Sequence, residues 1–408
     1  RSANRWLIHF EGGGSCNTYE DCAERWCGVG FYTAHQMSAT YENNAINRGG
    51  LLSRNEINRL ANRNVVMLNY CSSDEWQGRK SGTLFEHPTD PTKNYTLDFR
   101  GATIALAALD ALDRGVEGLP RLTDATDILI SGDSAGANGV RSHLDRIAAR
   151  YPRTRVRGHL EATFGPDRNG RQGFPAGDPR DPVYPGKTET FNRVQLGLRN
   201  ALLDDSCMAA HPTAPYLCSD SSYNASNHIT TPFIQVHDIA DEGLIGSYLD
   251  AGFVATTTQF AQAIHDQLTA LVNIKNTAVE RASITTPPGV AGRLCGVHVM
   301  WGDDDGFFGR RYRTGPTATA YSHYELLWNW LTGATPTVVI EPRPPDSTST
   351  PVFDSICNAK MPTAVAPTIA TVNSASYAAN AAIAPESIVA TFGASLAPRT
   401  VVAETLPL

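Results

Sequence analysis

The sequence predicts an α/β protein with a doubly wound, mainly parallel sheet and long loop insertions. Short apolar runs of strand length alternate with longer stretches whose apolar residues recur at helical spacing. This alternation is typical of a parallel sheet covered by helices on both faces. The chain has 408 residues, of which 41% are hydrophobic and 18% are charged. These values suit one large globular domain plus a smaller appendage.

The expected strands are short and apolar, and most of them end at glycine or polar residues. They are 5–10, 64–70, 127–132, 231–238 and 294–301, the last of which is a strand or the end of one. The expected helices carry apolar residues three or four positions apart. They are 100–116, 138–151, 258–272 and 322–333.

Two regions depart from this alternation. The segment 152–230 is rich in Pro, Gly, Asp and Asn, and we expect it to form long insertions over the ligand-binding end of the sheet. Later in the chain the composition shifts to Ala, Thr, Ser and Pro with few charges. The predicted organisation is a main domain over 1–335, a linker or the end of that domain over 336–363, and a truncated appendage over 364–408.

The charge and hydropathy of the chain exclude some classes of protein. The formal net charge is −7 and there is no long basic run, which argues against a nucleic-acid partner. The sequence has no run of about 18 consecutive apolar residues, so it predicts no membrane span. The chain enters an apolar run soon after Arg1, without an initiator Met or a leader. We therefore expect a mature product or a fragment. We also expect the protein to act as a monomer.

The chain contains eight cysteines. An even number favours disulfide bonds and a secreted or extracytoplasmic location, and Cys207 and Cys218 are a candidate pair around a short loop. Cys16, Cys22 and Cys27 could instead be metal ligands. No second close cluster of Cys or His completes a set of four ligands, so zinc is the weaker interpretation.

The pentapeptide Gly-Asp-Ser-Ala-Gly at 132–136 has the G-x-S-x-G pattern. An apolar strand precedes it and an amphipathic helix follows it. In that context a tight turn exposes the serine hydroxyl and points backbone N–H groups at the same place. An ordinary strand-to-helix turn is the alternative, but the context favours Ser134 as a nucleophile.

A serine nucleophile needs a base, which an acid orients. His298 is favoured as the base because it follows an apolar run late in the chain, where the order Ser, Asp, His requires a histidine. His323 is a rival at the start of a helix, and His237 directly follows a strand. Asp238 and Asp241 are both candidate acids near a strand end, and spacing alone does not choose between them.

A developing oxyanion needs N–H donors. The run Gly12-Gly13-Gly14 after the first strand allows close backbone approach, and the N–H of Ala135 would join it. A merely flexible turn is the alternative for any glycine run. The acidic run 303–305 follows His298 too closely to supply the acid. It is either a solvated turn or a cation-binding loop.

Four blocks of this sequence resemble the pectin acetylesterase/notum family in order and rough spacing. They are WLIHFEGGGSCNTYEDCAERW, NYCSSDEWQGR, ISGDSAGANGV and CGVHVMW, and the likeness covers about residues 5–330. The resemblance implies an α/β-hydrolase fold and a serine carboxylesterase with no metal and no cofactor.

Carried over by motif, the resemblance implies Ser134, His298 and Asp241 as the catalytic residues, with Asp238 in reserve. It implies an oxyanion hole at Gly13, Gly14 and Ala135. Trp76 matches an aromatic residue near the substrate pocket, although plain core packing explains it equally well.

The sequence also departs from the family pattern. Ser15 stands after the three glycines where the family usually has an aromatic residue, which alters the pocket wall and the expected acyl preference. Asp133 and Ala137 replace the usual neighbours of the nucleophile. The charge of Asp133 is expected to shift the titration of His298.

Three functions remain open at this point. The first is a secreted, bacterial serine esterase that removes acetyl groups from a polysaccharide such as pectin. The second is a carboxylesterase for longer or lipid acyl esters. The third is a non-catalytic carbohydrate-binding or surface-binding protein on a hydrolase scaffold.

Overall fold

A computed structural model describes the chain over most of its length. The described residues are 4–28, 37, 49–115, 119–166, 191–250, 254, 256–280, 286–314, 318–345, 370–373 and 389–392. The chain divides into two compact units, Arg1–Ala359 and Lys360–Leu408.

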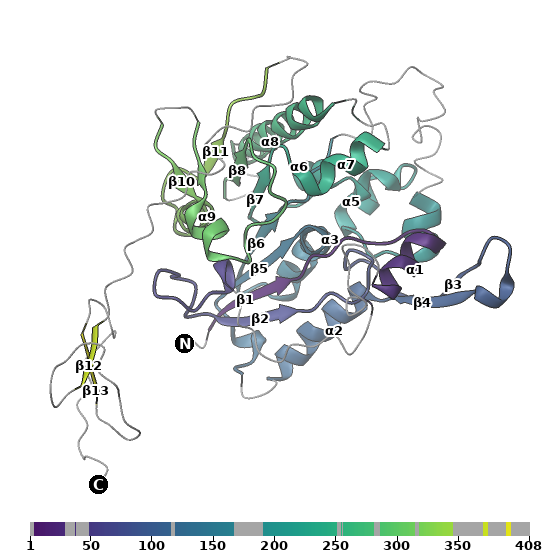
Figure 1. Cartoon of the computed structure of the whole chain (residues 1–408), viewed down its shortest axis with the longest axis horizontal. Helices are drawn as coiled ribbons and strands as arrows, with labels where there is room; N and C mark the ends of the chain where they lie inside the picture. The colour runs from purple at the N-terminus through teal and green to yellow at the C-terminus, as the bar shows by residue number, and fades with distance from the viewer. Residues whose placement is uncertain are drawn as a thin grey trace, which may run out of the picture. The chain divides into compact units, whose positions relative to one another are not determined.

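Among the described residues of the first unit, seven strands form one sheet in which every neighbouring pair is parallel (Figure 1). The order is β11-β8-β7-β6-β5-β1-β2. The bounds are β1 Arg5–Phe10, β2 Asn64–Leu68, β5 Asp127–Asp133, β6 Arg155–Glu161, β7 Phe233–Asp238, β8 Gly289–Arg293 and β11 Val338–Ile340. This arrangement confirms the predicted α/β class and the mainly parallel sheet.

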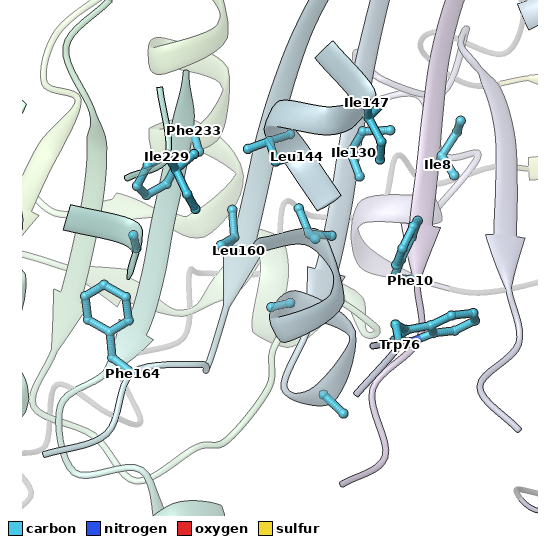
Figure 2. Close-up of a cluster of buried hydrophobic side chains, with 14 of the residues drawn as sticks. Ile8, Phe10, Trp76, Ile130, Leu144, Ile147, Leu160, Phe164, Ile229 and Phe233 are labelled. Carbon is cyan, nitrogen blue, oxygen red and sulfur yellow. The ribbon is translucent and has the colours of Figure 1, made fainter. Parts of the chain in front are cut away.

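Helices cover both faces of the sheet because its strands are apolar on both sides. In β1 and β5, even-numbered residues such as Ile8 and Ile130 belong to one cluster with residues of α2, α3 and α8, and Figure 2 shows Leu144 and Ile147 of α3 in it. Odd-numbered residues of the same strands, such as Leu7 and Leu129, belong to a second cluster with α9. The bounds of these helices are α2 Gly101–Arg114, α3 Ala135–Arg150, α8 Thr257–Glu280 and α9 His323–Thr332.

Smaller elements surround the sheet. The short helices are α1 Tyr19–Cys27, α5 Asp205–Ala210, α6 Ser221–Asn227 and α7 Glu242–Asp250. The segments of 3-10 or π geometry are η2 Gly50–Leu52, η3 Pro91–Lys93, η5 Leu122–Asp124, η6 Phe191–Leu198, η7 Pro215–Ser219 and η8 Asp305–Gly309. The antiparallel pairs are β3 Lys80–Phe85 with β4 Tyr95–Phe99 and β9 Arg311–Tyr312 with β10 Tyr321–Ser322. In the second unit, β12 Ala370–Asn373 pairs with β13 Val389–Phe392.

Disulfide bonds join Cys16 to Cys22 and Cys207 to Cys218. Cys295 is also disulfide-bonded. The first of these bonds excludes the zinc interpretation of Cys16 and Cys22. Across the described ranges, no helix combines the length and the apolar character that a membrane crossing needs.

Two expectations about secondary structure were wrong. Residues 294–301 form a loop after β8, because carboxylates rather than a neighbouring strand bind its backbone: Val297 N–H donates to Asp238 and Met300 N–H to Glu161. The region 152–230 contains the central strand β6, whose alternating basic residues hide its apolar pattern. Residues 167–190 of that region lie outside the described residues.

The domain boundaries expected at 335 and 363 stay a prediction. β11 lies within the expected linker and pairs with β8 of the main sheet. Residues 346–369 are outside the described part of the chain.

We expect the packing of α8 to be an important source of stability. Ile264 is completely buried in the core, whereas Ile274 on the same helix is 39% exposed. Ile264→Ala should therefore lower the free energy of unfolding by about 2–5 kcal/mol. The matched variant Ile274→Ala should change it by no more than about 0.5 kcal/mol. Urea unfolding followed by circular dichroism measures both, and equal losses would contradict the described packing.

Candidate active site

Ser134 lies on a sharp turn between β5 and α3. Its backbone has φ 50° and ψ −121°, a region that costs energy for a residue with a side chain. The turn needs glycine at positions 132 and 136, which flank the three residues Asp133 to Ala135. A Cβ at Gly136 would lie 2.0 Å from the carbonyl oxygen of Phe10, and one at Gly132 would lie 2.5 Å from Gly136. The turn therefore has the strained strand-to-helix geometry that the pentapeptide predicts.

His298 and Asp241 meet Ser134 from two other strand ends. Ser134 Oγ lies 2.8 Å from His298 Nε2, and His298 Nδ1 lies 2.8 Å from both carboxylate oxygens of Asp241. Asp241 is fully buried and also accepts the backbone N–H groups of Gly243 and Leu244. The carboxylate is thus held in place while it binds the imidazole.

The rival residues have other partners. Asp238 forms a buried ion pair with Arg293, at 2.7 Å for the closest atoms, and accepts the N–H of Val297. His323 Nε2 lies 2.7 Å from His159 Nε2 on the α9 side of the sheet. His237 Nε2 is 3.6 Å from Asp241, beyond hydrogen-bond distance. Of the residues weighed from the sequence, the structure brings only Ser134, His298 and Asp241 together.

The charges around His298 change its affinity for a proton. Burial lowers the pKa of His298, but the hydrogen bond with Asp241 and the negative charges of Asp241, Asp133 and Asp238 outweigh burial. The net effect is a pKa above the ordinary value. Asp133 thus acts on His298 in the direction expected of a nearby carboxylate.

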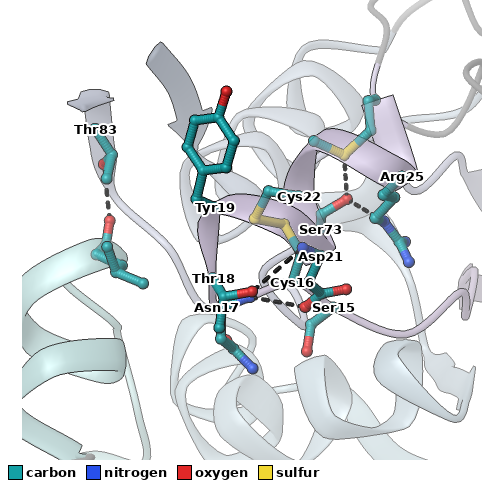
Figure 3. The surroundings of a disulfide bond; sticks show 12 residues. Ser15, Cys16, Asn17, Thr18, Tyr19, Asp21, Cys22, Arg25, Ser73 and Thr83 are labelled. Atoms are coloured by element: carbon teal, nitrogen blue, oxygen red, sulfur yellow. Dashed lines mark hydrogen bonds between the residues drawn. A yellow bond between two sulfur atoms is a disulfide. The ribbon is translucent and has the colours of Figure 1, made fainter. Parts of the chain in front are cut away.

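The glycine loop after β1 lies beside Ser134. Gly13 and Gly14 have φ values of 139° and 67°, which favour glycine. Their carbonyl oxygens accept hydrogen bonds from Arg25 and Tyr70, the latter at 2.8 Å, and Figure 3 shows Arg25 beside Ser73, to which it donates at 2.6 Å. The structure shows no hydrogen bond from the N–H groups of Gly13, Gly14 and Ala135 to any described residue. These amides are free to bind an anionic oxygen.

A pocket of about 480 Å³ opens over Ser134. Part of its lining is polar: Ser15 donates to Glu75 at 2.9 Å, and Arg199 lies 3.4 Å from Glu75 and 2.6 Å from Asn17. Apolar residues also line the pocket, among them Ala162, Pro166, Phe191, Val194, Leu244 and Tyr248. Ser15 therefore lies in the pocket wall, in the position expected from the sequence.

Trp76 does not line the pocket. Its side chain is fully buried and its indole N–H donates to the carbonyl of Glu11 at 2.9 Å. A Cβ at Gly139 of α3 would lie 2.5 Å from Trp76. The assignment of Trp76 to the substrate pocket was wrong, since the ring packs in the core between the glycine loop and α3.

Other residues of the site escaped the sequence analysis. Arg199 comes from the region without a clear pattern, and Glu75 and Tyr70 lie in the second of the four resembling blocks. Glu75 and Tyr70 could have been identified from the sequence as polar residues within such a block. In the acidic run, Asp303 accepts the N–H of Gly306, and Asp304 accepts the N–H of Gly50, which is far away in the sequence.

Comparisons with known proteins agree with this geometry. A family model described as Pectinacetylesterase matches residues 1–278. The palmitoleoyl-protein carboxylesterase NOTUM of Drosophila melanogaster is 28% identical over 250 residues, which cover 59% of this chain and 34% of that protein. Pectin acetylesterase 5 of Arabidopsis thaliana is 32% identical over 151 residues, which cover 36% of this chain and 31% of that protein. The matches span about a third of the length of these curated relatives.

The solved structure of the Wnt deacylase Notum from Drosophila has the same fold. It superposes with a TM-score of 0.59 at 21% identity, over 83% of this chain and 88% of that chain. The chain therefore has the α/β-hydrolase-like fold of that structure. The chain belongs to the pectinacetylesterase family.

We expect the imidazole of His298 to titrate above its ordinary pKa of about 6.5. Asp241→Asn should lower that pKa, because it removes the charge that the imidazolium faces. Histidine-selective NMR titration measures both values. The ring of His265, which contacts Asp266 instead, serves as the internal control. An unchanged His298 titration in Asp241→Asn would argue against the described contact.

Proposed function

We propose that this chain is a serine carboxylesterase that acts through Ser134, His298 and Asp241. The observation that carries the proposal is the continuous line of hydrogen bonds from Ser134 through His298 to Asp241, with 2.8 Å at each step. Nucleophile, base and orienting acid come from the loops after β5, β8 and β7, and this is the arrangement that a triad requires.

The reaction begins when Ser134 Oγ attacks the carbonyl carbon of an ester and His298 Nε2 takes the hydroxyl proton. The negative charge that develops on the carbonyl oxygen is stabilised by the N–H groups of Gly13, Gly14 and Ala135. His298 then gives its proton to the departing alcohol, which leaves an acyl-Ser134. Water, deprotonated by His298, attacks the acyl group, and Ser134 regains its proton as the acid is released.

The buried carboxylate of Asp241 supports each of these steps. It accepts the N–H at Nδ1 of His298 and thereby keeps Nε2 available for the serine proton. It also stabilises the imidazolium that forms during attack, which agrees with the raised pKa of His298.

The proposed substrate is an acetyl ester of a polysaccharide such as pectin. The polar lining residues Ser15, Glu75 and Arg199 suit a hydroxylated alcohol part, which can form hydrogen bonds with them. The name of the matched family, Pectinacetylesterase, supports the same class of substrate.

A longer acyl group is the second candidate. The apolar lining residues Phe191, Val194 and Leu244 and the relatives named palmitoleoyl-protein carboxylesterase favour it. The pocket volume of about 480 Å³ is within the usual range for small-molecule sites. Chain-length preference decides between the two.

We further propose that the protein works as a monomer outside the cytoplasm. The disulfides Cys16–Cys22 and Cys207–Cys218 support an oxidising compartment. All the residues proposed for the reaction come from one chain.

We expect the protein to hydrolyse p-nitrophenyl acetate faster than the butyrate and octanoate esters. Ser134→Ala should lower kcat by about 10³-fold or more, because no other side chain supplies the nucleophile. Ser142→Ala, at a buried serine of the same helix α3, should retain the activity. A preference for octanoate would favour the long-acyl candidate. A wild-type protein inert on all three esters would favour a non-catalytic binding protein instead.

The two candidate acids should behave differently. Asp241→Asn should lower kcat by about 10⁴-fold with the fold intact, because the amide holds the wrong tautomer of His298. Asp238→Asn leaves the buried charge of Arg293 without its partner and should cost about 3–5 kcal/mol of stability. Kinetics and thermal unfolding of both variants check this. A larger loss of kcat per folded molecule in Asp238→Asn would contradict the assignment.

A further inference from the structure

Asp133 links the two parts of the site that must act together. It is the last residue of β5, directly before Ser134. Its Oδ1 accepts the N–H of Gly12 at 3.1 Å and lies 3.2 Å from His9 Nε2. Its other oxygen packs against the glycine loop, since a Cβ at Gly12 would lie 2.3 Å from Oδ2.

We propose that Asp133 is a positioning residue that holds the glycine loop Gly12–Gly14 beside the nucleophile, so that the loop can receive the oxyanion. The proposal rests on the esterase function proposed above. Asp133 itself is not expected to touch the substrate, because it does not line the pocket over Ser134.

The backbone explains why a side chain is needed at this point. β1 and β5 pair in parallel as far as Phe10 and Gly132. Beyond that point the N–H of Glu11 bonds to Leu68 on the β2 side, as N–H groups alternate between the two neighbours of a central strand. The N–H of Gly12 bonds on the β5 side, but to the side chain of Asp133 rather than to a backbone carbonyl. This bond tethers the glycine loop to the end of β5 where the backbone pairing has ended.

A buried row of polar side chains supports Asp133 from behind. His9, Ser131 and His159 face one another across β1, β5 and β6 in register, and α9 adds His323. Their hydrogen bonds measure 3.0 Å, 2.9 Å and 2.7 Å from His9 to His323. All four side chains are completely buried, so an unpaired polar atom in the row is costly. At its far end, Nδ1 of His323 has no hydrogen-bond partner among the described residues.

The donors in this row can all point toward Asp133. Burial lowers the pKa of His159 to about 3 and that of His323 well below its ordinary value, so each ring carries one proton. Since a carboxylate only accepts, His9 Nε2 donates to Asp133. In the arrangement where Nδ1 of His9 accepts, Ser131 donates to His9, His159 to Ser131, and His323 to His159. The row thus fixes the orientation of the carboxylate that holds Gly12.

Three variants separate the hydrogen bonds of Asp133 from its charge. Asp133→Asn keeps an oxygen at Oδ1, which takes both contacts, but removes the charge. Asp133→Ala removes both. Asp145→Ala is the matched control, because Asp145 accepts the N–H groups of Thr230 and Thr231 in another loop.

The first readout needs no substrate. Hydrogen exchange of the peptide that contains Gly12–Gly14 should be faster in Asp133→Ala than in the wild type, and unchanged in Asp133→Asn and Asp145→Ala. The second readout is kinetic, on the p-nitrophenyl ester that the wild type prefers. Asp133→Ala should lower kcat by about 10²-fold with little change in KM, because misplaced donors lose their effect only in the transition state. Asp133→Asn should retain most of kcat. Each variant is assayed on its own pH plateau, since loss of the charge lowers the pKa of His298.

Unchanged exchange of the glycine loop in Asp133→Ala overturns the proposal, whatever happens to activity. Equal losses of kcat in the Asn and Ala variants also overturn it, because the charge and not the tether would then matter. If the wild type is inert but the loop loosens in Asp133→Ala, the tether stands and the proposed esterase function fails. If Asp133→Ala does not fold, Asp133→Ser, whose hydroxyl is closer to the backbone, replaces it in the same comparison.

Discussion

The hydrogen bond between His298 and Asp241 is the contact on which the geometry of the site depends, because it joins the loops that follow two different strands. Ser134 is fixed by its own turn, but His298 lies on a loop without regular structure. Asp241 can hold that loop because its carboxylate is itself fixed by two backbone N–H groups. A buried acid that is rigid in this way orients the imidazole at little entropic cost when substrate binds.

Other buried carboxylates hold the same loop from its base. Asp238 binds both Arg293, at the end of β8, and the N–H of Val297. Glu161 accepts the N–H of Met300, and burial raises its pKa well above the ordinary value. In this loop, carboxyl groups accept the backbone N–H groups that a neighbouring strand would accept elsewhere in the sheet. This is why an apolar segment such as 294–301 leaves the sheet and can carry a histidine to the nucleophile.

The sequence predicts much of this molecule because local patterns specify it. The strand before Ser134, the helix after it and the glycine loop are each readable from adjacent residues. The choice between Asp238 and Asp241 is not, since Asp238 ends β7 and Asp241 lies three residues later. The position of Arg293, which pairs with Asp238, distinguishes the two. β6 escapes prediction for a related reason: the arginines at 155 and 157 bind Asp127 across the sheet, so a buried strand has a polar sequence. Trp76 shows that a motif does not predict where each of its side chains points. Glu75 of the same block lines the pocket, whereas the ring of Trp76 lies in the core.

The polar and the apolar residues that line the pocket make opposite demands on a bound molecule. Arg199 is almost completely buried, and Glu75, with 23% of its side chain exposed, is its charged partner. An apolar chain laid against Glu75 would remove its water without offering a hydrogen bond, which is costly for a charged group. A hydroxyl group in the same place can replace that water. The apolar lining residues gain instead from any methyl or methylene group that they cover. An ester that places hydroxyl groups beside Glu75 and hydrocarbon beside the apolar residues would therefore meet both demands of the proposed site.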